Sequence, residues 1–294
     1  MGLVINEKEN ELNMTLSAPL VKKLDLQSET QHLFYVREST PLLCAIPWLT
    51  DARLYGVPVI DERMRVTGTI THDEVLQVMS IMDDDPKRFL QKLRTEEVVT
   101  PPLVFNIYDE LKRVITEFVE RKKLVGVVVN ASGFPITTIT LCDVVKSLID
   151  CEPLRSLLAD VNAISASMRV KKVPMELSVK DVISILTSNG SSAIELDDTH
   201  FCVTRVSLVN GLLSSFKLYQ FLNHPHQFLN SSVLNDKDVL LPAHRISEKS
   251  SILDVGYYLR RVGEEQIVKL NDIHYIGVQS LCFAIGSILL EVSA

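Results

Sequence analysis

One short pattern recurs four times along the chain, and it constrains the fold more than any other feature. In each copy a β-branched or apolar run leads to Thr or Ser. Two residues, a polar residue in all copies but the fourth, and then more apolar positions follow. The anchors of the four copies are Thr71, Thr140, Ser207 and Ser280, so the unit recurs about every 70 residues. An internal repeat of this kind predicts a modular architecture in which each copy is one supersecondary unit.

A strand is predicted about a dozen residues before each anchor. The four runs end in Asp or Asn and are Gly56–Asp61, Val125–Asn130, Ser192–Asp197 and Gln266–Asn271. Their β-branched content and their terminal turn residues are typical of a buried strand that leads into a turn.

Helices are predicted on both sides of each strand pair. The pattern is clearest in the second copy, where Leu111, Val114, Ile115, Phe118 and Val119 share one helix face. Each unit therefore reads helix, strand, turn, strand, helix. Polar connectors are expected at roughly 80–97, 150–171 and 217–238.

Composition excludes several classes of protein. The chain has 294 residues, 46% of them hydrophobic, and a formal net charge of −7, which argues against a nucleic-acid partner because neutralising phosphates takes a basic excess. The five cysteines contain no C-x-x-C pair, so no disulfide framework and no metal site is expected. The most apolar stretch, 276–290, is shorter than the roughly 20 residues of a membrane span, and residues 1–11 lack the pattern of a signal peptide. We expect a soluble, cytoplasmic protein without a membrane partner.

Catalytic motifs are missing from the sequence. It contains no Gly-rich phosphate loop, no G-x-S-x-G elbow, no H-E-x-x-H and no G-x-G-x-x-G. We therefore expect a protein that is not an enzyme.

The strand pairs resemble those of the cystathionine β-synthase (CBS) domain. That family shows a strand such as Gly-Val-Pro-Val-Ile-Asp, about ten residues, and then Gly-x-Ile-Thr-x-x-Asp/Glu-Val. The first unit reproduces the second part around Thr71, and the second unit has its Ile-Thr-x-x-Asp-Val around Thr140. The second unit is the closest match and includes Val99-Thr100-Pro101-Pro102 at its start, whereas the third and fourth are diverged. The resemblance covers all but the first thirty or so residues, and four CBS units without an appended enzyme are similar to the gamma subunit of AMP-activated protein kinase and to stand-alone archaeal proteins.

The resemblance implies an α/β (α+β) fold. Four helix-strand-strand-helix units would form two Bateman pairs in a flattened, disk-like body. The N-terminal pair is expected at 1–150, with units at about 32–80 and 98–150. The C-terminal pair is expected at 151–294, with units at about 168–220 and 239–294.

The resemblance also implies an adenine-nucleotide site in the N-terminal pair. By position, Asp143 and Thr140 would meet the ribose hydroxyls, while Arg121, Lys122 and Arg53 would meet phosphate through charge-assisted hydrogen bonds. Thr100 at the start of the second unit is a further candidate, and the apolar residues expected at the adenine are Val127, Val128 and Pro58. Weaker second sites are expected at Thr71 with Glu74 and at Ser207 with Asn210.

The fourth unit is expected to lack a nucleotide site. Phe283 takes the place of the ribose carboxylate, and Glu264 with Glu265 takes the place of the basic pair. Such a cleft would be empty or hold an uncharged molecule.

Ordinary helix chemistry accounts for the same residues. Thr140 with Asp143 and Thr71 with Glu74 fit capping boxes, and Arg121-Lys122-Lys123 fits the positively charged end of a helix.

Taken with the resemblance, these residues predict a regulatory, energy-sensing protein that binds AMP, ADP or ATP without an obligatory cofactor. It would relay occupancy to a partner, either a protein kinase or another enzyme subunit, and a second copy of the chain is a further candidate partner. Two alternatives stay open: a structural or interaction scaffold with degenerate clefts, and a binder of S-adenosylmethionine or another adenosyl compound.

Overall fold

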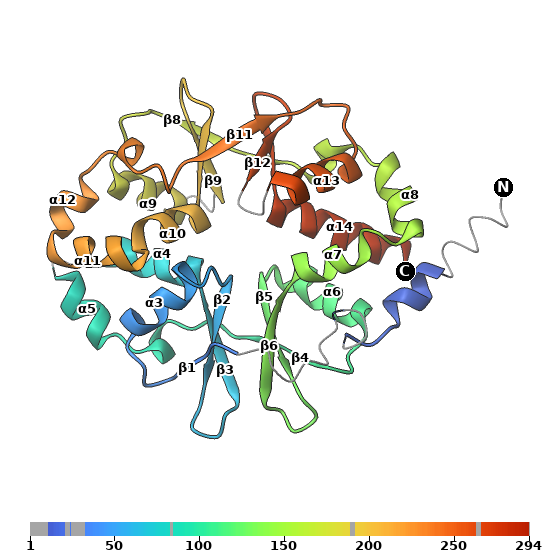
Figure 1. Cartoon of the computed structure of the whole chain (residues 1–294), viewed down its shortest axis with the longest axis horizontal. Helices are drawn as coiled ribbons and strands as arrows, with labels where there is room; N and C mark the ends of the chain where they lie inside the picture. The colour runs from blue at the N-terminus through green and yellow to red at the C-terminus, as the bar shows by residue number, and fades with distance from the viewer. Residues whose placement is uncertain are drawn as a thin grey trace.

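The computed structural model describes residues 11–20, 24, 33–82, 85–188, 192–262 and 266–293. Within them, each of the four predicted units contains the expected strand pair flanked by helices, preceded by a short first strand. Figure 1 shows the units around a common centre, with the strands of units 1 and 2 at the bottom and those of units 3 and 4 at the top.

The N-terminal units share one order of elements. Unit 1 consists of β1 (Val36–Arg37), α3 (Leu42–Thr50), β2 (Gly56–Ile60), β3 (Val66–Thr71) and α4 (His72–Ile81). Unit 2 consists of β4 (Leu103–Asn106), α6 (Leu111–Arg121), β5 (Val125–Val129), β6 (Pro135–Thr140) and α7 (Leu141–Leu148). In both, the first strand pairs parallel to the second, and the second pairs antiparallel to the third.

The C-terminal units repeat this order. Unit 3 consists of β7 (Met168–Arg169), β8 (Lys171–Val173), α9 (Val179–Ser188), β9 (Ala193–Leu196), β10 (Phe201–Thr204) and α10 (Arg205–Leu213). Unit 4 consists of β11 (Leu241–Arg245), α13 (Ile252–Val262), β12 (Ile267–Lys269), β13 (His274–Gly277) and α14 (Val278–Val292). Because β11 pairs with β10, the strands of both units merge into one seven-stranded sheet, ordered β7-β13-β12-β11-β10-β9-β8.

The connectors between units are helical. They contain α5 (Pro86–Lys92) and η1 (Thr95–Glu97); α8 (Glu152–Asp160) and η2 (Ala163–Ala166); and α11 (Ser215–Asn223), α12 (Pro225–Leu229) and η3 (Val233–Asn235). No helix in the described part of the chain combines the length and apolar character needed to cross a bilayer.

The predicted turn residues act through their side chains. Asp61 Oδ1 accepts hydrogen bonds from the backbone N–H groups of Arg63 and Arg65, both at 2.8 Å. Asn130 and Asn271 do the same in units 2 and 4. Short side chains that bond to nearby backbone groups stabilise turns, which explains why each of these three strands ends at Asp or Asn.

Two large apolar cores join the halves of the chain, and a third, smaller cluster lies on the C-terminal sheet. The helices of unit 1 pack on those of unit 3, and the helices of unit 2 pack on those of unit 4. In Figure 1 the first group lies on the left flank and the second on the right. The predicted face of α6 belongs to the second core, where Leu111, Val114, Ile115 and Phe118 are fully buried. Each core therefore crosses from one half of the chain to the other.

Candidate ligand site

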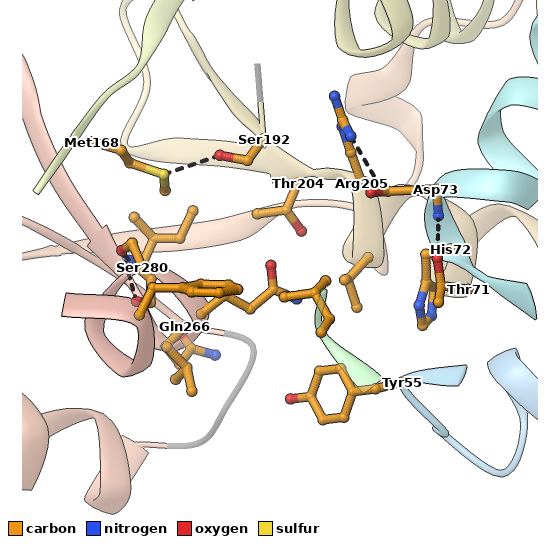
Figure 2. Close-up of a pocket in the computed structure, with 17 residues that line it drawn as sticks. Tyr55, Thr71, His72, Asp73, Met168, Ser192, Thr204, Arg205, Gln266 and Ser280 are labelled. Atoms are coloured by element: carbon orange, nitrogen blue, oxygen red, sulfur yellow. Dashed lines mark hydrogen bonds and ion pairs between the residues drawn. The ribbon is translucent and has the colours of Figure 1, made fainter. Parts of the chain in front are cut away.

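A cavity of about 310 Å³ lies where the units meet. This volume falls at the lower end of the roughly 300–1,000 Å³ typical of small-molecule sites. Units 1, 3 and 4 supply most of the described wall and unit 2 contributes Leu124. The described lining residues are Tyr55, Thr71, His72, Asp73, Leu124, Met168, Ser192, Thr204, Arg205, Val206, Gln266, Ile267, Gly277, Val278, Gln279, Ser280 and Phe283. Figure 2 shows Gln266 and Ser280 on one side of this central cavity and Arg205, Asp73 and His72 on the other.

Three helices begin at the central cavity. The helices α4, α10 and α14 start after Thr71, Thr204 and Gly277, and all three residues line it. The hydroxyl of Thr204 accepts from the Ser207 N–H at 2.9 Å. Ser280 Oγ in turn accepts from the Gly277 N–H at 3.1 Å. Because the first turn of a helix carries partial positive charge, three such ends favour a negatively charged group between them.

The side chain of Gln266 brings an unpaired acceptor to the wall. Its Oε1 is the one buried side-chain N or O atom in the described part of the chain that lacks a hydrogen-bond partner. Leaving such a group unpaired costs about 1–3 kcal/mol. The wall therefore contains a side chain with an unsatisfied acceptor, which the N–H or O–H donor of a ligand would satisfy once the amide turns toward the cavity.

One ion pair lies at the rim of the central cavity. Arg205 Nη1 is 3.2 Å from Asp73 Oδ1, which joins the first turn of α10 to the first turn of α4. Beside it, His72 Nε2 and Asn210 Oδ1 are 2.9 Å apart. Both contacts link unit 1 to unit 3.

Comparison with solved structures identifies the architecture. Protein MJ1225 from Methanocaldococcus jannaschii, put forward as an archaeal homologue of g-AMPK, superposes with a TM-score of 0.70 over 90% of this chain and 98% of that chain, at 13% identity. The chain has the four-unit CBS fold.

Further comparisons give shorter or weaker matches. The CBS domain of a membrane protein from Sphaerobacter thermophilus covers 50% of this chain, with 98% of its own length matched, 19% identity and a TM-score of 0.40. An uncharacterized protein of M. jannaschii, MJ1004, is 29% identical over 132 residues, which is 44% of this chain. The chain spans 56% of the length of that curated relative. No family model matches the sequence.

Of the residues predicted for the CBS site, Asp143 and Thr140 meet each other. Asp143 Oδ2 accepts from the Thr140 backbone N–H and from its hydroxyl, both at 2.7 Å. This is the capping box that the sequence allowed, and the Asp143 side chain is exposed. Thr140 lines a small cavity of about 10 Å³ that shares Tyr55, Leu124, Gln279 and Phe283 with the central one.

The predicted phosphate residues lie outside the central cavity. Arg121 pairs with Glu117 at 2.6 Å along α6, and Lys122 caps that helix with a left-handed φ of 51°. Arg53 has the same φ of 51° just after α3. Both Lys122 and Arg53 are exposed and stand three positions before the first residue of a buried strand, so units 1 and 2 do place basic residues at equivalent positions.

The remaining predicted residues are mostly structural. Thr100 bonds through its backbone to Thr69, while Pro58, Val127 and Val128 are buried inside their sheets. Thr71 is the one member of the predicted set that lines the central cavity, and Glu74 caps the helix beside it.

The predicted anchors of units 3 and 4 are wrong by one helical turn. The residue before α10 is Thr204 rather than Ser207, and the residue before α14 is Gly277 rather than Ser280. Ser207 and Ser280 therefore stand where the first two units have Glu74 and Asp143.

This shift changes two expectations. Asn210 lies a turn further along α10 and contacts His72, so it does not stand at the position equivalent to Asp143. Phe283 likewise lies one turn further along α14 than expected and lines the central cavity. Ser280, and not Phe283, therefore stands at the position equivalent to Asp143. Glu264 and Glu265 lie outside the described residues.

Sequence reasoning missed Gln266, Arg205 and Tyr55 as cavity residues. Gln266 opens a strand that the sequence did indicate, and Arg205 directly follows the true anchor Thr204. A correct helix start in unit 3 would have drawn attention to Arg205. Nothing in the local sequence around Tyr55 or Gln266 indicates that they face the same space.

A second, outward groove lies on the C-terminal sheet. Buried Glu195, which lines it, accepts from Lys269 at 2.7 Å and from the Tyr275 hydroxyl. Burial and the bond to Glu195 raise the pKa of Tyr275, and burial beside the same carboxylate raises the pKa of Cys202 to about 12. Among the described residues, no cluster of three His, Cys, Asp or Glu side chains could hold a metal ion.

Proposed function

We propose that this chain is a non-catalytic regulatory protein whose central cavity binds an adenine nucleotide. The observation that carries the proposal is the buried, unpaired Oε1 of Gln266 in the wall of a cavity of small-molecule size. Every adenine compound carries an exocyclic amino group that donates hydrogen bonds. Such a donor would satisfy Oε1 of Gln266, and the side-chain NH2 group of the same residue can donate to a ring nitrogen.

The rest of the wall suits a nucleoside. Tyr55, Phe283 and Ile267 offer aromatic and aliphatic surface for a flat base. Thr204, Ser192 and Ser280 bring hydroxyls that can donate to or accept from a sugar. Apolar walls with a few placed polar groups are the usual composition of a small-molecule site.

The four-unit fold supports the regulatory part of the proposal. MJ1225, which has the same arrangement of units, has been put forward as a homologue of g-AMPK. In this chain both cores and the central cavity join the two halves, so a ligand there would favour one relative packing of the units over another. Such a population shift, passed to a partner enzyme, requires different ligand affinity in the two states.

Thermal unfolding with AMP, ADP, ATP and S-adenosylmethionine tests the proposal. A ligand present at 100 times its dissociation constant stabilises the native state by about 2.7 kcal/mol. We expect at least one nucleotide to raise the unfolding midpoint. No shift from any of the four would contradict nucleotide binding and favour the scaffold alternative, whereas a shift from S-adenosylmethionine alone would replace the nucleotide by that ligand.

The variant Gln266→Leu locates the site. It removes an unpaired buried oxygen, so the unliganded variant should be as stable as the wild type or more stable. The nucleotide-induced shift should shrink at the same time. Gln91→Leu, at an exposed position of α5, is the matched control and should leave the shift unchanged. A full shift in Gln266→Leu would place the ligand elsewhere, and the N-terminal residues around Asp143 would become the next location to test.

A further inference from the structure

Among the described residues, the charged lining of the central cavity is one ion pair. Of the 17 described residues that line it, Arg205 and Asp73 are the Arg, Lys, Asp or Glu side chains. Their dashed contact in Figure 2 spans 3.2 Å between Arg205 Nη1 and Asp73 Oδ1. The wall therefore contains a cation that is paired with a carboxylate of the protein itself.

This pair joins the two halves of the chain. Asp73 belongs to the first turn of α4 in unit 1, and Arg205 is the first residue of α10 in unit 3. Arg205 also donates from Nη2 to the Leu186 carbonyl at the end of α9, at 3.0 Å. The guanidinium thus contacts the ends of three helices at the joint between units 1 and 3.

The ion pair is open enough to be exchanged. The Arg205 and Asp73 side chains keep 24% and 38% of their exposure, respectively. Ion pairs in contact with solvent contribute little to stability, whereas a guanidinium binds phosphate through two parallel, charge-assisted hydrogen bonds. A phosphate group that reaches the cavity would therefore compete well with Asp73.

The two anions cannot share the site at low cost. Phosphate beside Arg205 would lie close to the Asp73 carboxylate, and like charges at short range repel. Asp73 lies at the start of α4 in unit 1, and Arg205 lies at the start of α10 in unit 3. Moving the Asp73 carboxylate away from Arg205 therefore alters the contact between units 1 and 3.

We propose that Arg205 is the phosphate receptor of the central cavity and that Asp73 is its resident counter-ion. When a phosphate-bearing adenine nucleotide binds, its phosphate then replaces the Asp73 carboxylate as the partner of Arg205 at the α4–α10 joint. This inference rests on the proposed function and adds two properties to it. The site binds nucleotides more tightly than the uncharged nucleoside. The change of partner at Arg205 is the step by which a bound nucleotide alters the contact between units 1 and 3.

Calorimetric titration of the whole chain with AMP and with adenosine tests the exchange. The wild type should bind AMP more tightly than adenosine. In Arg205→Gln the AMP affinity should fall by about tenfold or more, because a hydrogen bond between charged groups is lost, while adenosine affinity stays close to that of the wild type. Arg205→Lys keeps the charge and should retain part of the preference for AMP.

The variant Asp73→Asn tests whether the Asp73 carboxylate competes with phosphate for Arg205. Because it removes the competitor, AMP affinity should rise by about two- to fivefold, with adenosine unchanged. Asp150→Asn is the matched control, because Asp150 forms an exposed pair with Arg260 at 3.0 Å away from the central cavity. It should change neither affinity.

The outcomes distinguish the inference from the proposed function. Equal affinity of the wild type for AMP and adenosine, or no gain for AMP in Asp73→Asn, overturns the exchange and leaves nucleotide binding intact. Absence of binding by both ligands overturns the cavity as a site and the exchange with it. Thermal unfolding of each variant without ligand shows whether it is folded. If Arg205→Gln does not fold, the AMP and adenosine affinities of the single variants Arg205→Lys and Asp73→Asn decide between the outcomes.

Discussion

Glu195 and Lys269 stand at the same place in the two equivalent strands of units 3 and 4, and their side chains meet at 2.7 Å. Their strands, β9 and β12, are not neighbours, because β10 and β11 lie between them in the sheet. The sheet must therefore curve until the two side chains touch. Units 1 and 2 have Val59 and Val128 at the equivalent positions, so a buried ion pair in one half replaces apolar contacts in the other.

Removing one partner of this pair should destabilise the chain strongly. In Lys269→Val the carboxylate of Glu195, which is 2% exposed, loses its closest cation. Breaking a buried pair from one side costs about 3–5 kcal/mol. Urea unfolding should show a loss of this order, lessened by the more distant Lys172, which lies 3.8 Å from Glu195.

A triple variant supplies the control for that loss. Glu195→Val combined with Lys269→Val and Tyr275→Phe removes the charges and also the hydroxyl that bonds to Glu195. Replacing a buried ion pair by apolar residues is often neutral, so much of the lost stability should return. A triple variant that is as unstable as Lys269→Val would show that the pair is not what holds this region.

Alkaline pH should weaken the same region. Burial and the bond to Glu195 raise the pKa of Tyr275 above its ordinary value of 10.0. A group whose pKa is raised by folding contributes stability that is complete below its unfolded pKa and is lost as pH rises. The contribution of Tyr275 is therefore present at neutral pH and declines above pH 10.

The neighbouring thiol adds to this effect. Burial raises the pKa of Cys202 from 9.0 to about 12, so its contribution is lost between those two pH values. The urea midpoint should fall between pH 9 and pH 11 and fall less in Tyr275→Phe. Tyr108→Phe, at a residue that is 65% exposed, should follow the wild type. Parallel curves for Tyr275→Phe and the wild type would contradict the assignment.

Local sequence patterns predicted the units but not the site. The α6 face and the turns after β2 and β5 depend on residues close together in the chain, and all were recognisable. Units 3 and 4 misled because Thr204-x-x-Ser207 and Ser207-x-x-Asn210 are overlapping patterns of the same form. Only the true start of the helix decides between them.

The central cavity depends on contacts that no local pattern contains. Tyr55, Arg205 and Gln266 come from three different units and meet through the packing of unit 1 on unit 3 and of unit 2 on unit 4. Their individual roles follow from burial and hydrogen bonding, which are properties of the assembled chain. The division of the chain after residue 150 and the roles assigned to Asp143, Arg121 and Lys122 stay predictions.

The variant Asp143→Ala tests one of those roles. It removes the acceptor of the Thr140 N–H at the start of α7, and loss of a cap costs about 1 kcal/mol. Thermal unfolding should show this loss without ligand. If Asp143 also binds ribose, the stabilisation by AMP should disappear as well.

Asp181→Ala is the matched variant for Asp143→Ala. Asp181 accepts from the N–H and hydroxyl of Ser178 at the start of α9, in the same arrangement. Both variants should lose similar stability. If Asp143 binds ribose, Asp143→Ala alone should also lose AMP binding. A normal AMP shift in both would leave Asp143 as a helix cap and favour the central cavity.

The contact between units 2 and 4 depends on a glycine in α14. A Cβ atom at Gly286 would lie 2.9 Å from Val119 Cγ2 and 3.6 Å from Leu141. Alanine favours a helix over glycine by about 1 kcal/mol, but overpacking a close contact costs about 1–3 kcal/mol. Gly286→Ala should therefore destabilise the chain, as measured by its urea midpoint.

A second glycine and a double-mutant cycle separate the two effects. At Gly256, in α13, a Cβ would meet mainly the flexible end of Ile149, so Gly256→Ala should be neutral or stabilising. Val119→Ala makes room beside Gly286, so combining it with Gly286→Ala should cost less than the sum of the single changes. If Gly286→Ala is as stable as Gly256→Ala, α14 does not approach α6 closely. The apolar core that joins units 2 and 4 would then tolerate a looser packing than the one described.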